Sequence, residues 1–535
     1  MISLYHSDLL IQPNAPYPNE VAIVDGTRPV TIACLFDKSK RLAIGMKSRG
    51  FKKNDIVLIT LPPGESFLVV VYAVAMLRGR VAIIDPEMGK IHFAAKLRQL
   101  SPSWAFVDSR LIFLRDHRWI GFLLHKIKRN VPEIVDIENC VVIATGMWVP
   151  TFERFPRMKE LLKSDQEVEF IQDHSDHDFL IIYTSGTIHE PKGVVHSFKG
   201  LASSIDNLRK LIEAKPGDVL GTGLPHYMML GIAAKIPVSI FSTSASPRVR
   251  IREIEQKRVT LLFGAPSEYL PLIKYCEITG KKLPSCLRKV FFGSAPVHTT
   301  FLRKFFIVAP VHLETICLYG MTELLICAFI KGQEKLTMKT QRGDVLGKLV
   351  DDVECRIGPD GEILLRSPQL FSRYFHAKGK SGFHATGDSG FLDDQCNLVL
   401  TGRKKDMIIR KNFNIYPAIY ETIIRNIAGV DECAVVGIWS DQKEDEEIYL
   451  VVEGDRLKLE KIRNQLAYGP NAIQKEAWPD QIVQMPIPRN GKHEKVDKKK
   501  LRELLSKRRF DVALNYSRGM AIQGVTKAST HRIWP

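Results

Sequence analysis

Closely spaced cysteine pairs are absent from this chain of 535 residues, which has nine cysteines but no Cys-x-x-Cys sequence. Many zinc sites and redox-active dithiols use such pairs, and small disulfide-bonded proteins need cysteines at much higher density. We therefore expect neither a zinc site of this kind nor a disulfide framework. Scattered cysteines are typical of a reducing compartment, so we expect a cytoplasmic protein.

Long apolar runs are missing as well. The longest, Phe67–Leu77, is about half as long as a membrane-spanning helix and is followed by Arg78 and Arg80. We expect it to form a buried helix of the protein core. The first residues also lack a basic region followed by a long apolar stretch, so no signal peptide is expected.

A balance of charge is the third thing that the sequence lacks, because its net charge is +17. Such a basic chain favours acidic partners, which include nucleotides, coenzymes, anionic membrane surfaces and nucleic acids. The hydrophobic content of 45% and the charged content of 25% are those of a globular protein. A chain of this length is expected to hold about two or three subdomains.

The residues that follow the apolar run Phe179–Tyr183 suit the binding of phosphate. This run predicts a buried strand, and it is followed by Thr184, Ser185, Gly186 and Thr187 and, after a proline, by Lys192. Small residues let backbone N–H groups converge on an anion, hydroxyls add donors, and lysine adds charge. No Walker A pattern runs through this segment. A polyphosphate-binding loop and an ordinary polar surface loop are both compatible with these residues.

The periodicity of the chain predicts an α/β fold. Val57–Leu61 and Val81–Ile84 are expected strands on either side of an expected helix at Ser66–Leu77. This order is typical of a strand–helix–strand unit in a parallel sheet. Short strands with Gly and Asp turns predict a β-rich subdomain from residue 345 to 400, and an α+β unit is expected after Arg403.

A basic stretch with aromatic residues occupies positions 110–130. Such a segment suits the surface of an anionic membrane, which would give the protein a peripheral membrane contact. The alternative, an amphipathic helix on the protein surface, is the more common origin of this pattern.

Four further short motifs carry groups that suit a nucleotide. They are Tyr319-Gly-Met-Thr-Glu323, Thr386-Gly-Asp388, Gly402-Arg-Lys-Lys-Asp406 and Arg489-Asn-Gly-Lys-His-Glu-Lys-Val-Asp-Lys498. Each motif alone has an ordinary structural reading, such as a turn-capping aspartate or a solvated charge run. Together with the loop at 184–192, in this order, they resemble the adenylate-forming superfamily, which includes acyl-CoA synthetases, luciferases and the adenylation domains of peptide synthetases.

The resemblance covers about residues 20–510 and implies a domain organisation. Residues 1–402 are expected to form a large AMP-binding domain of two α/β subdomains and a small β-barrel-like piece. Residues 403–510 are expected to form a small α+β lid, with the hinge at residues 403–405. The basic tail, residues 511–535, is assigned no role.

The resemblance also implies the roles of individual residues. Thr184, Ser185, Gly186, Thr187 and Lys192 would hold the ATP phosphates. Gly293, Ser294 and Ala295 would flank adenine, with Tyr319 and Gly320 beside it. Thr322 would touch the α-phosphate, Glu323 would bind Mg²⁺, and Asp388 and Arg403 would hold the ribose.

The catalytic lysine of the lid has two candidates. Gly491-Lys492 matches the dipeptide of the family, whereas spacing from Leu501-Arg-Glu503 assigns Lys495. We prefer Lys495. Thr322, Lys192 and Lys495 are then the expected catalytic residues.

The implied activity is ATP-dependent activation of a carboxylic acid, such as a fatty acid, as an acyl-adenylate, followed by transfer to coenzyme A. ATP and Mg²⁺ are the implied cofactors, with coenzyme A or an acyl-carrier protein as acceptor, and no nucleic acid is expected. The sequence departs from the family pattern at Ile188 and His189 in the phosphate loop, at Met228, and at Ile409, Asn412 and Ile419 in the lid.

These departures leave other activities open. Val81-Ala-Ile-Ile-Asp-Pro-Glu-Met-Gly89 resembles a segment of the olefin-biosynthesis β-lactone synthetases, which close an adenylated 3-hydroxy acid on its own hydroxyl. Loading of a carrier protein is a further alternative. A degenerate member that binds nucleotide without turnover is the last.

Overall fold

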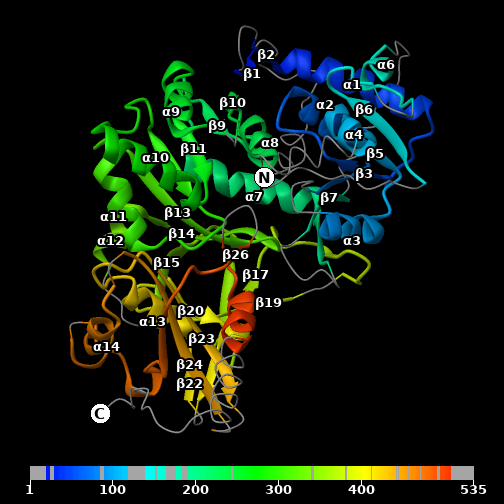
Figure 1. The fold of residues 1–535 in the computed structure, drawn as a ribbon. Coiled ribbons are helices and arrows are strands. Elements are labelled where there is room, and N and C mark those ends of the chain that lie inside the picture. Colours follow the sequence, from blue (N-terminus) through cyan, green and yellow to red (C-terminus); the bar gives the residue numbers. More distant parts are fainter. Residues whose placement is uncertain are drawn as a thin grey trace.

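The computed structural model describes residues 20–24, 29–84, 90–117, 139–150, 154–163, 176–183, 191–242, 245–338, 343–379, 382–410, 413–440, 443, 445–455, 457–469, 471–490 and 495–507. Figure 1 shows two α/β layers at the top of the molecule, with a β-rich lobe and the C-terminal segment below them. The expected α/β class is therefore confirmed.

The first layer is a seven-stranded sheet in the order β18-β8-β7-β4-β3-β5-β6. Its strands are β3 (Ile56–Ile59), β4 (Arg80–Ile83), β5 (Trp104–Asp108), β6 (Val141–Thr145), β7 (Asp178–Tyr183), β8 (Gly193–Ser197) and β18 (Arg373–Tyr374). Its helices are α1 (Ile32–Ser48), α2 (Glu65–Met76), α3 (Lys90–Leu100), α4 (Ser109–Asp116) and α6 (Met158–Leu161). Strands β3 and β4 are parallel, as expected, whereas β7 and β8 are antiparallel.

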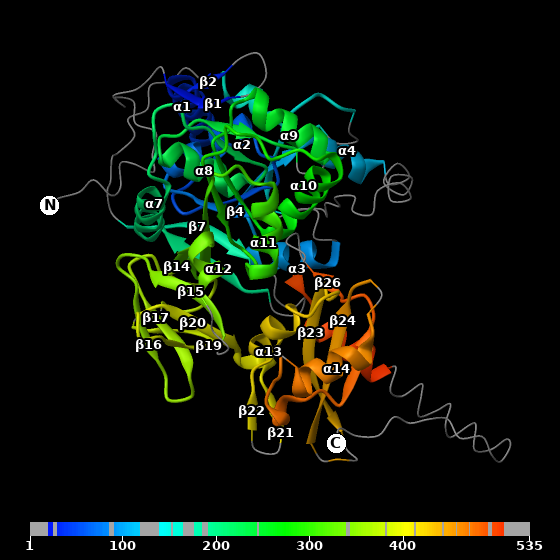
Figure 2. The ribbon, with the colours of Figure 1, turned by 90° about the vertical axis from the view of Figure 1, so that its left-hand side faces the viewer.

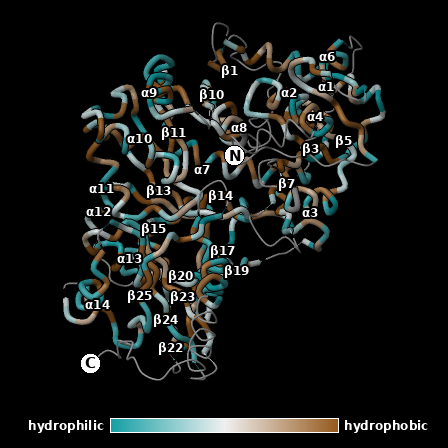
Figure 3. Tube along the Cα trace, in the orientation of Figure 1, coloured by the Kyte–Doolittle hydropathy of each residue, from teal (hydrophilic) through white to brown (hydrophobic). Residues whose placement is uncertain are grey.

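Helix α2 is the core helix that its apolar sequence predicts. Residues Phe67–Ala75 are all buried, because apolar side chains surround the helix instead of following one face. Among the described residues, no helix combines the length and the apolar character needed to cross a membrane. In Figure 3 the apolar colours concentrate along inner strands such as β3 and β7, whereas the outer helix α9 is largely hydrophilic.

The second layer is a thirteen-stranded sheet in the order β16-β17-β19-β20-β15-β14-β13-β12-β11-β9-β10-β1-β2. Its strands are β1 (Val21–Ile23), β2 (Val30–Thr31), β9 (Leu220–Thr222), β10 (Val238–Ile240), β11 (Leu261–Gly264), β12 (Lys289–Phe292), β13 (Glu314–Met321), β14 (Leu324–Lys331), β15 (Asp344–Leu349), β16 (Glu354–Ile357), β17 (Glu362–Arg366), β19 (His384–Leu392) and β20 (Leu398–Arg403). Its helices are α7 (Phe198–Ile212), α8 (Pro225–Ala233), α9 (Pro247–Gln256), α10 (Pro266–Thr279), α11 (Thr299–Val308) and α12 (Gly332–Thr337).

This long sheet changes character at β13. Strands β11, β12 and β13 are parallel neighbours, whereas β13, β14, β15 and β20 pair antiparallel. The antiparallel end forms the yellow-green lobe of Figure 2 and matches the β-rich subdomain expected at residues 345–400. One hydrogen-bonded sheet therefore runs from the parallel strands to β20, which leads into the C-terminal segment.

The C-terminal segment has its own apolar cores. It contains a 3-10 turn (Lys404–Asp406), β21 (Ile408–Arg410), β22 (Phe413–Ile415), α13 (Pro417–Ile424), β23 (Glu432–Ser440), β24 (Asp445–Glu453), α14 (Leu459–Tyr468), a second 3-10 turn (Lys475–Ala477), β25 (Gln481–Gln484), β26 (Arg489–Asn490) and β27 (Lys495–Val496), and residues 498–507 are helical. Helix α13 contacts β15 and β20, so this segment packs on the β-rich lobe.

Candidate active site

Asp388 is the centre of a polar group formed by three distant parts of the chain. The Tyr319 hydroxyl donates to Asp388 Oδ2 at 2.7 Å, and Arg403 Nε lies 3.3 Å from Asp388 Oδ1. Tyr319 comes from the end of β13, Asp388 from β19 and Arg403 from the end of β20. The structure thus brings together three residues that the sequence analysis assigned to one nucleotide.

The local structure of β19 explains how Asp388 is presented. The Thr386-Gly387-Asp388 motif lies within a strand and not in an open turn, and Gly387 has a φ of 75° that suits glycine. The Thr386 hydroxyl donates to the Ile363 carbonyl at 2.8 Å and accepts from the Asp388 N–H at 3.0 Å. Asp388 faces Arg403 in the register of β19 and β20, so the pair is fixed by the sheet.

Burial controls the ionisation of this group. Desolvation raises the pKa of Asp388, although Arg403 and the Tyr319 hydroxyl both act in the opposite direction. Burial and the Asp388 carboxylate raise the pKa of Tyr319 well above its ordinary value, so this hydroxyl remains a donor. A buried carboxylate with donors on both oxygens can still accept further hydrogen bonds from the hydroxyls of a ribose.

A second polar group surrounds the turn between β13 and β14. The Tyr374 hydroxyl donates to Glu323 Oε1 at 2.9 Å, and Lys192 Nζ lies 5.7 Å from the centre of the Tyr374 ring. His196 donates through Nε2 to the Thr322 carbonyl at 2.7 Å. Burial lowers the pKa of His196, so the ring stays neutral at neutral pH. Lys192 directly precedes β8, and this contact connects β8 to the Thr322–Glu323 turn.

The fit of Mg²⁺ to this turn depends on Glu323. In the described part of the chain no cluster of three or more His, Cys, Asp or Glu side chains could hold a metal. Mg²⁺ in nucleotide sites commonly uses one or two carboxylates and takes its other ligands from phosphates and water. The half-buried Glu323 carboxylate, held by Tyr374, fits that mode.

The residues expected near adenine follow β12 and precede β14. Ser294 has a φ of 63°, in the left-handed region, and the Gly293 N–H donates to the Gly264 carbonyl at 3.1 Å. Ala295 follows in the same turn. At Gly320 a Cβ would lie 2.1 Å from the Leu325 carbonyl oxygen, so only glycine fits between β13 and β14.

The described lysine of the C-terminal segment reaches the first group. Lys495 lies on β27, which pairs with β26, so a short hairpin presents it. Desolvation and then the positive charge of Arg403 lower the pKa of Lys495, whereas Asp388 opposes this shift. The hairpin therefore brings Lys495 close enough to Arg403 and Asp388 for their charges to shift its pKa. The other candidate, Lys492, falls outside the described residues.

Several expected residues cannot be placed. Thr184, Ser185, Gly186 and Thr187 lie outside the described residues, as do the departures Ile188, His189 and Asn412 and the segment 85–89. Tyr183 and Gly193 are paired in the antiparallel β7–β8 ladder, so the two ends of the loop segment are held side by side. Lys192 therefore stands at the base of that segment, close to Tyr374.

The sequence analysis did not single out Tyr374 or His196. The Tyr374–Glu323 contact spans 51 positions and the His196–Thr322 contact spans 126. Only the location of His196 four residues after Lys192 gave a signal, because alternate residues of a strand share a face.

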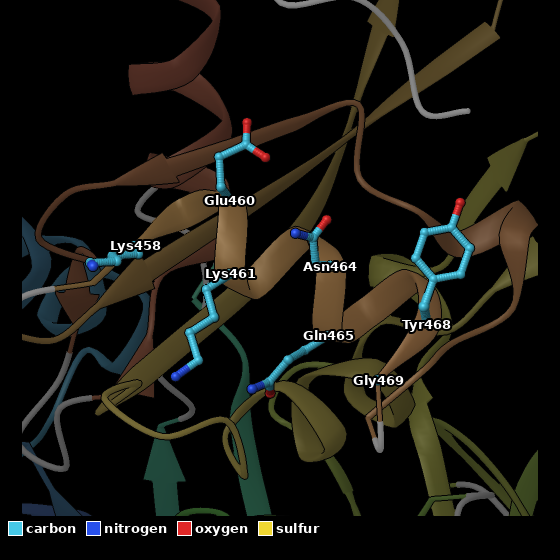
Figure 4. A pocket seen from close by; sticks show the side chains of 7 residues that line it. All are labelled: Lys458, Glu460, Lys461, Asn464, Gln465, Tyr468 and Gly469. Atoms are coloured by element: carbon cyan, nitrogen blue, oxygen red, sulfur yellow. The ribbon is translucent and has the colours of Figure 1, made fainter.

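A surface depression lies away from both polar groups. A depression of about 530 Å³ lies along α14 and is lined by Lys458, Glu460, Lys461, Asn464, Gln465, Tyr468 and Gly469. In Figure 4 Lys461 and Gln465 point to the same side of this helix, whereas Glu460 points away. None of these residues belongs to either polar group, so we do not assign this depression to the site.

Comparisons with known proteins agree with this arrangement. The family described as AMP-binding enzyme matches residues 12–375. The 2-succinylbenzoate–CoA ligase of Bacillus licheniformis is 25% identical over 454 residues, which cover 81% of this chain and 87% of that protein. The long-chain-fatty-acid–CoA ligase FadD13 of Mycobacterium tuberculosis is 25% identical over 480 residues, covering 86% of this chain and 90% of that protein. ATP-bound MatB from Rhodopseudomonas palustris shares the fold, with a TM-score of 0.74 at 22% identity over 94% of this chain and 99% of that one.

Proposed function

Because the chain belongs to the AMP-binding enzyme family, we propose that it activates a fatty or related carboxylic acid with ATP and transfers the acyl group to coenzyme A. The general reaction is that of an AMP-forming acid–CoA ligase, which proceeds through an acyl-adenylate. The observation that carries the proposal is the convergence of Tyr319 and Arg403 on Asp388, with the hairpin of Lys495 near enough for both charges to act on this lysine.

The polar groups suit the chemistry of the first half-reaction. The acid oxygen attacks the α-phosphorus of ATP, the bond to the β-phosphate oxygen breaks, and pyrophosphate leaves. Negative charge gathers on the phosphoryl oxygens during this step, so fixed positive charges lower its barrier. In this proposal Asp388 and Arg403 orient the ribose, and Lys495 and Lys192 face the phosphates. Mg²⁺ on Glu323 would neutralise phosphate charge.

We also propose that the chain divides into residues 1–402 and a lid of residues 403–510. Arg403 is paired with Asp388 on the first side, whereas Asp406 is paired with Arg502 of the C-terminal helix at 3.2 Å. Lys405 stands between these two attachments. A lid that rotates at this point would withdraw Lys495 after adenylation and admit a thiol.

The identity of the acid is tested by a panel of carboxylic acids. With ATP, Mg²⁺ and coenzyme A, fatty acids are expected to give AMP and acyl-CoA, detected by mass spectrometry. A fatty chain is supported by the apolar helix α8, in which Met228 is buried and Met229 and Leu230 are adjacent. Turnover of aromatic or dicarboxylic acids alone would contradict the fatty-acid assignment. AMP formation without acyl-CoA would contradict the choice of acceptor.

A second candidate reaction is closure of a 3-hydroxy acid to a β-lactone. The observation that favours it is Ile409, which is 53% exposed on β21 at the position where the family often has the lysine linked to thioester formation. An apolar side chain cannot bind the phosphates of coenzyme A. A neutral lactone formed from a 3-hydroxy acid without coenzyme A would support this reaction. An acyl-carrier protein as acceptor, or nucleotide binding without turnover, are the remaining outcomes of the same panel.

We propose a cytoplasmic location with peripheral membrane contact. The nine cysteines are free, in line with a reducing compartment. In α4 the apolar residues Leu111 and Ile112 are buried, so this described part of the basic stretch is a packed surface helix. The neighbouring loop after β6 instead exposes Met147 and Trp148, at 73% and 70% (β6 and α6, Figure 1).

Hydrogen bonds from two side chains hold the backbone of the exposed loop. Ser109 donates to the Met147 carbonyl at 2.5 Å, and Arg157 donates to the Gly146 carbonyl at 2.6 Å. The loop backbone is thus fixed while its apolar side chains face outward. Arg110, whose side chain is 65% exposed, lies next to Ser109 and is paired with Asp108 at 2.5 Å. The exposed apolar side chains fit a bilayer interface, and the net charge of +17 favours an anionic one.

Replacing both Met147 and Trp148 with alanine is expected to weaken binding to vesicles of phosphatidylglycerol and phosphatidylcholine by about tenfold, because insertion of the apolar side chains is lost. Co-sedimentation measures this effect. Wild-type protein should bind pure phosphatidylcholine vesicles much less. Ile278→Ala removes an apolar side chain that is 74% exposed in α10 and should bind like wild type. Equal binding by the double variant, or no binding by wild type, would refute the contact.

A further inference from the structure

We propose that Glu362 is a positioning residue that holds both the part of β19 that carries Asp388 and Lys404 of the hinge. This inference rests on the proposed function, because it concerns the Asp388 loop and the movement of the lid. Glu362 is the first residue of β17, directly after the Gly358–Gly361 turn.

The two oxygens of the Glu362 carboxylate have different partners. Oε1 accepts a hydrogen bond from the Gly387 N–H at 2.8 Å, and Gly387 immediately precedes Asp388. Oε2 lies 2.9 Å from Lys404 Nζ. One side chain therefore joins Gly387 of β19, next to Asp388, to Lys404.

Glu362 is better placed for this role than a surface carboxylate would be. Its side chain is only 13% exposed, whereas those of Lys404 and Asp360 are 44% and 52% exposed. Asp360 Oδ2 also pairs with Lys404 Nζ at 2.5 Å, and Asp360 Oδ1 accepts from the Glu362 N–H at 3.2 Å. The hairpin before β17 thus presents two carboxylates to one ammonium group, and hydrogen bonds with Asp360 and then Glu362 raise the pKa of Lys404.

The irregular register of the sheet explains why Glu362 reaches Gly387. The β17–β19 ladder shifts between Glu362 and Leu364, and Gly387 adopts its left-handed backbone conformation nearby. A regular ladder would pair this N–H with a backbone carbonyl. The bulge frees it, and the Glu362 side chain takes the place of that carbonyl.

The hinge is consequently held from both sides. Lys404 is bound to the β-rich lobe by Asp360 and Glu362, and Asp406 is bound to the lid by Arg502. Lys405 is the residue between these attachments. A rotation of the lid at Lys405 would then leave Gly387 and Asp388 of β19 in place.

The two contacts of Glu362 are separated by three variants. Glu362→Ala loses both contacts and leaves the Gly387 N–H without its partner, so it should weaken ATP binding about tenfold in calorimetry. Glu362→Gln keeps an acceptor for Gly387 and should bind ATP within about twofold of wild type. Lys404→Met removes the ion pairs with Glu362 and Asp360 but keeps the Gly387 contact, so it should also leave ATP binding unchanged.

The hinge contact has its own readouts. Glu362→Gln and Lys404→Met should each raise the rate of trypsin cleavage after Lys405 and lower kcat of ATP–pyrophosphate exchange about threefold with an unchanged KM for ATP. The double variant should be no worse than Lys404→Met alone, because that variant already removes the Glu362–Lys404 pair. Glu354→Gln is the matched control. It breaks an ion pair with Arg366 at 2.5 Å at the other end of the same β16–β17 hairpin and should change none of these quantities.

The outcomes distinguish this inference from the proposed function. Thermal unfolding identifies any variant that fails to fold, and Glu362→Gln provides the comparison if Glu362→Ala does. Equal ATP affinity in Glu362→Ala and wild type, or unchanged cleavage in Glu362→Gln and Lys404→Met, would overturn the inference. Absence of exchange in wild type with every acid would overturn the proposed function, while ATP affinity and cleavage would still decide the role of Glu362.

Discussion

Replacing Lys495 with alanine is expected to lower ATP–pyrophosphate exchange by at least about a hundredfold, with ATP binding little changed. The lysine feels the charges of Arg403 and Asp388, which are proposed to bind the ribose next to the α-phosphate. Removal of one fixed charge or donor that stabilises the transition state commonly lowers kcat by about 100- to 1,000-fold. Exchange of labelled pyrophosphate into ATP, measured with saturating acid, reports this step without the thiol.

Two further lysine variants give the controls. Lys499→Ala removes an exposed lysine four residues after Lys495 and should retain wild-type exchange. Lys492→Ala tests the alternative assignment. A large loss in Lys492→Ala together with normal exchange in Lys495→Ala would transfer the role to Lys492.

The pH dependence gives an independent check on Lys495. Burial, followed by the charge of Arg403, lowers its pKa, so its proton is lost at a lower pH than that of an ordinary lysine near 10.5. Exchange should therefore fall on the alkaline side before an unperturbed lysine would titrate. Lys495→Arg keeps its charge at any accessible pH, so this limb should vanish in that variant. Persistence of the limb would show that another group titrates.

Replacing Asp388 with asparagine is expected to raise the KM for ATP between about tenfold and a hundredfold. The carboxylate accepts hydrogen bonds from Tyr319 and pairs with Arg403, and a neutral amide would hold neither Arg403 nor the ribose hydroxyls as strongly. Initial-rate kinetics and calorimetric ATP binding measure the change. Asp394→Asn, an exposed residue of the β19–β20 hairpin, should behave like wild type.

The ionisation of Asp388 separates a binding defect from unfolding. Its folded-state pKa is raised above the ordinary value of 3.8, mainly by burial, so the folded chain holds this proton more tightly than the unfolded chain. The contribution of this group to stability therefore declines as pH rises past 3.8 toward the raised pKa. An uncharged asparagine avoids that desolvation, so the variant should unfold at or above the wild-type temperature at pH 7. A large drop in unfolding temperature would contradict this account.

The sequence predicted the elements of the fold well where hydrophobic patterns are simple. Strand β7 begins one residue before the apolar run Phe179–Tyr183 that predicted it. Thr322 and Glu323 form the turn between β13 and β14, whereas Tyr319, Gly320 and Met321 still belong to β13. These features depend on local residues and therefore leave a local signal.

The parts that the sequence did not predict depend on contacts between distant strands. Thr386-Gly387-Asp388 lies in a bulged strand because β17 and β19 shift register there, which no single segment encodes. Tyr374 reaches Glu323 because β18 pairs with β8, although β18 is only two residues long. Glu362 directly follows a turn, and its contact with the Gly387 N–H leaves no signal in the local sequence.

Strands β12, β13, β14, β15 and β20 are consecutive neighbours in one sheet, so the proposed nucleotide site and the proposed hinge are connected by that sheet. Hydrogen-bonded strands of that sheet carry the residues proposed to bind adenine and ribose. Its strand β20 ends at Arg403, where the proposed hinge begins. In the proposed mechanism, the part of the chain that moves between the two half-reactions follows Lys405. In the proposed mechanism, recognition of the ribose therefore stays with the sheet, whereas the choice of acceptor lies with the lid.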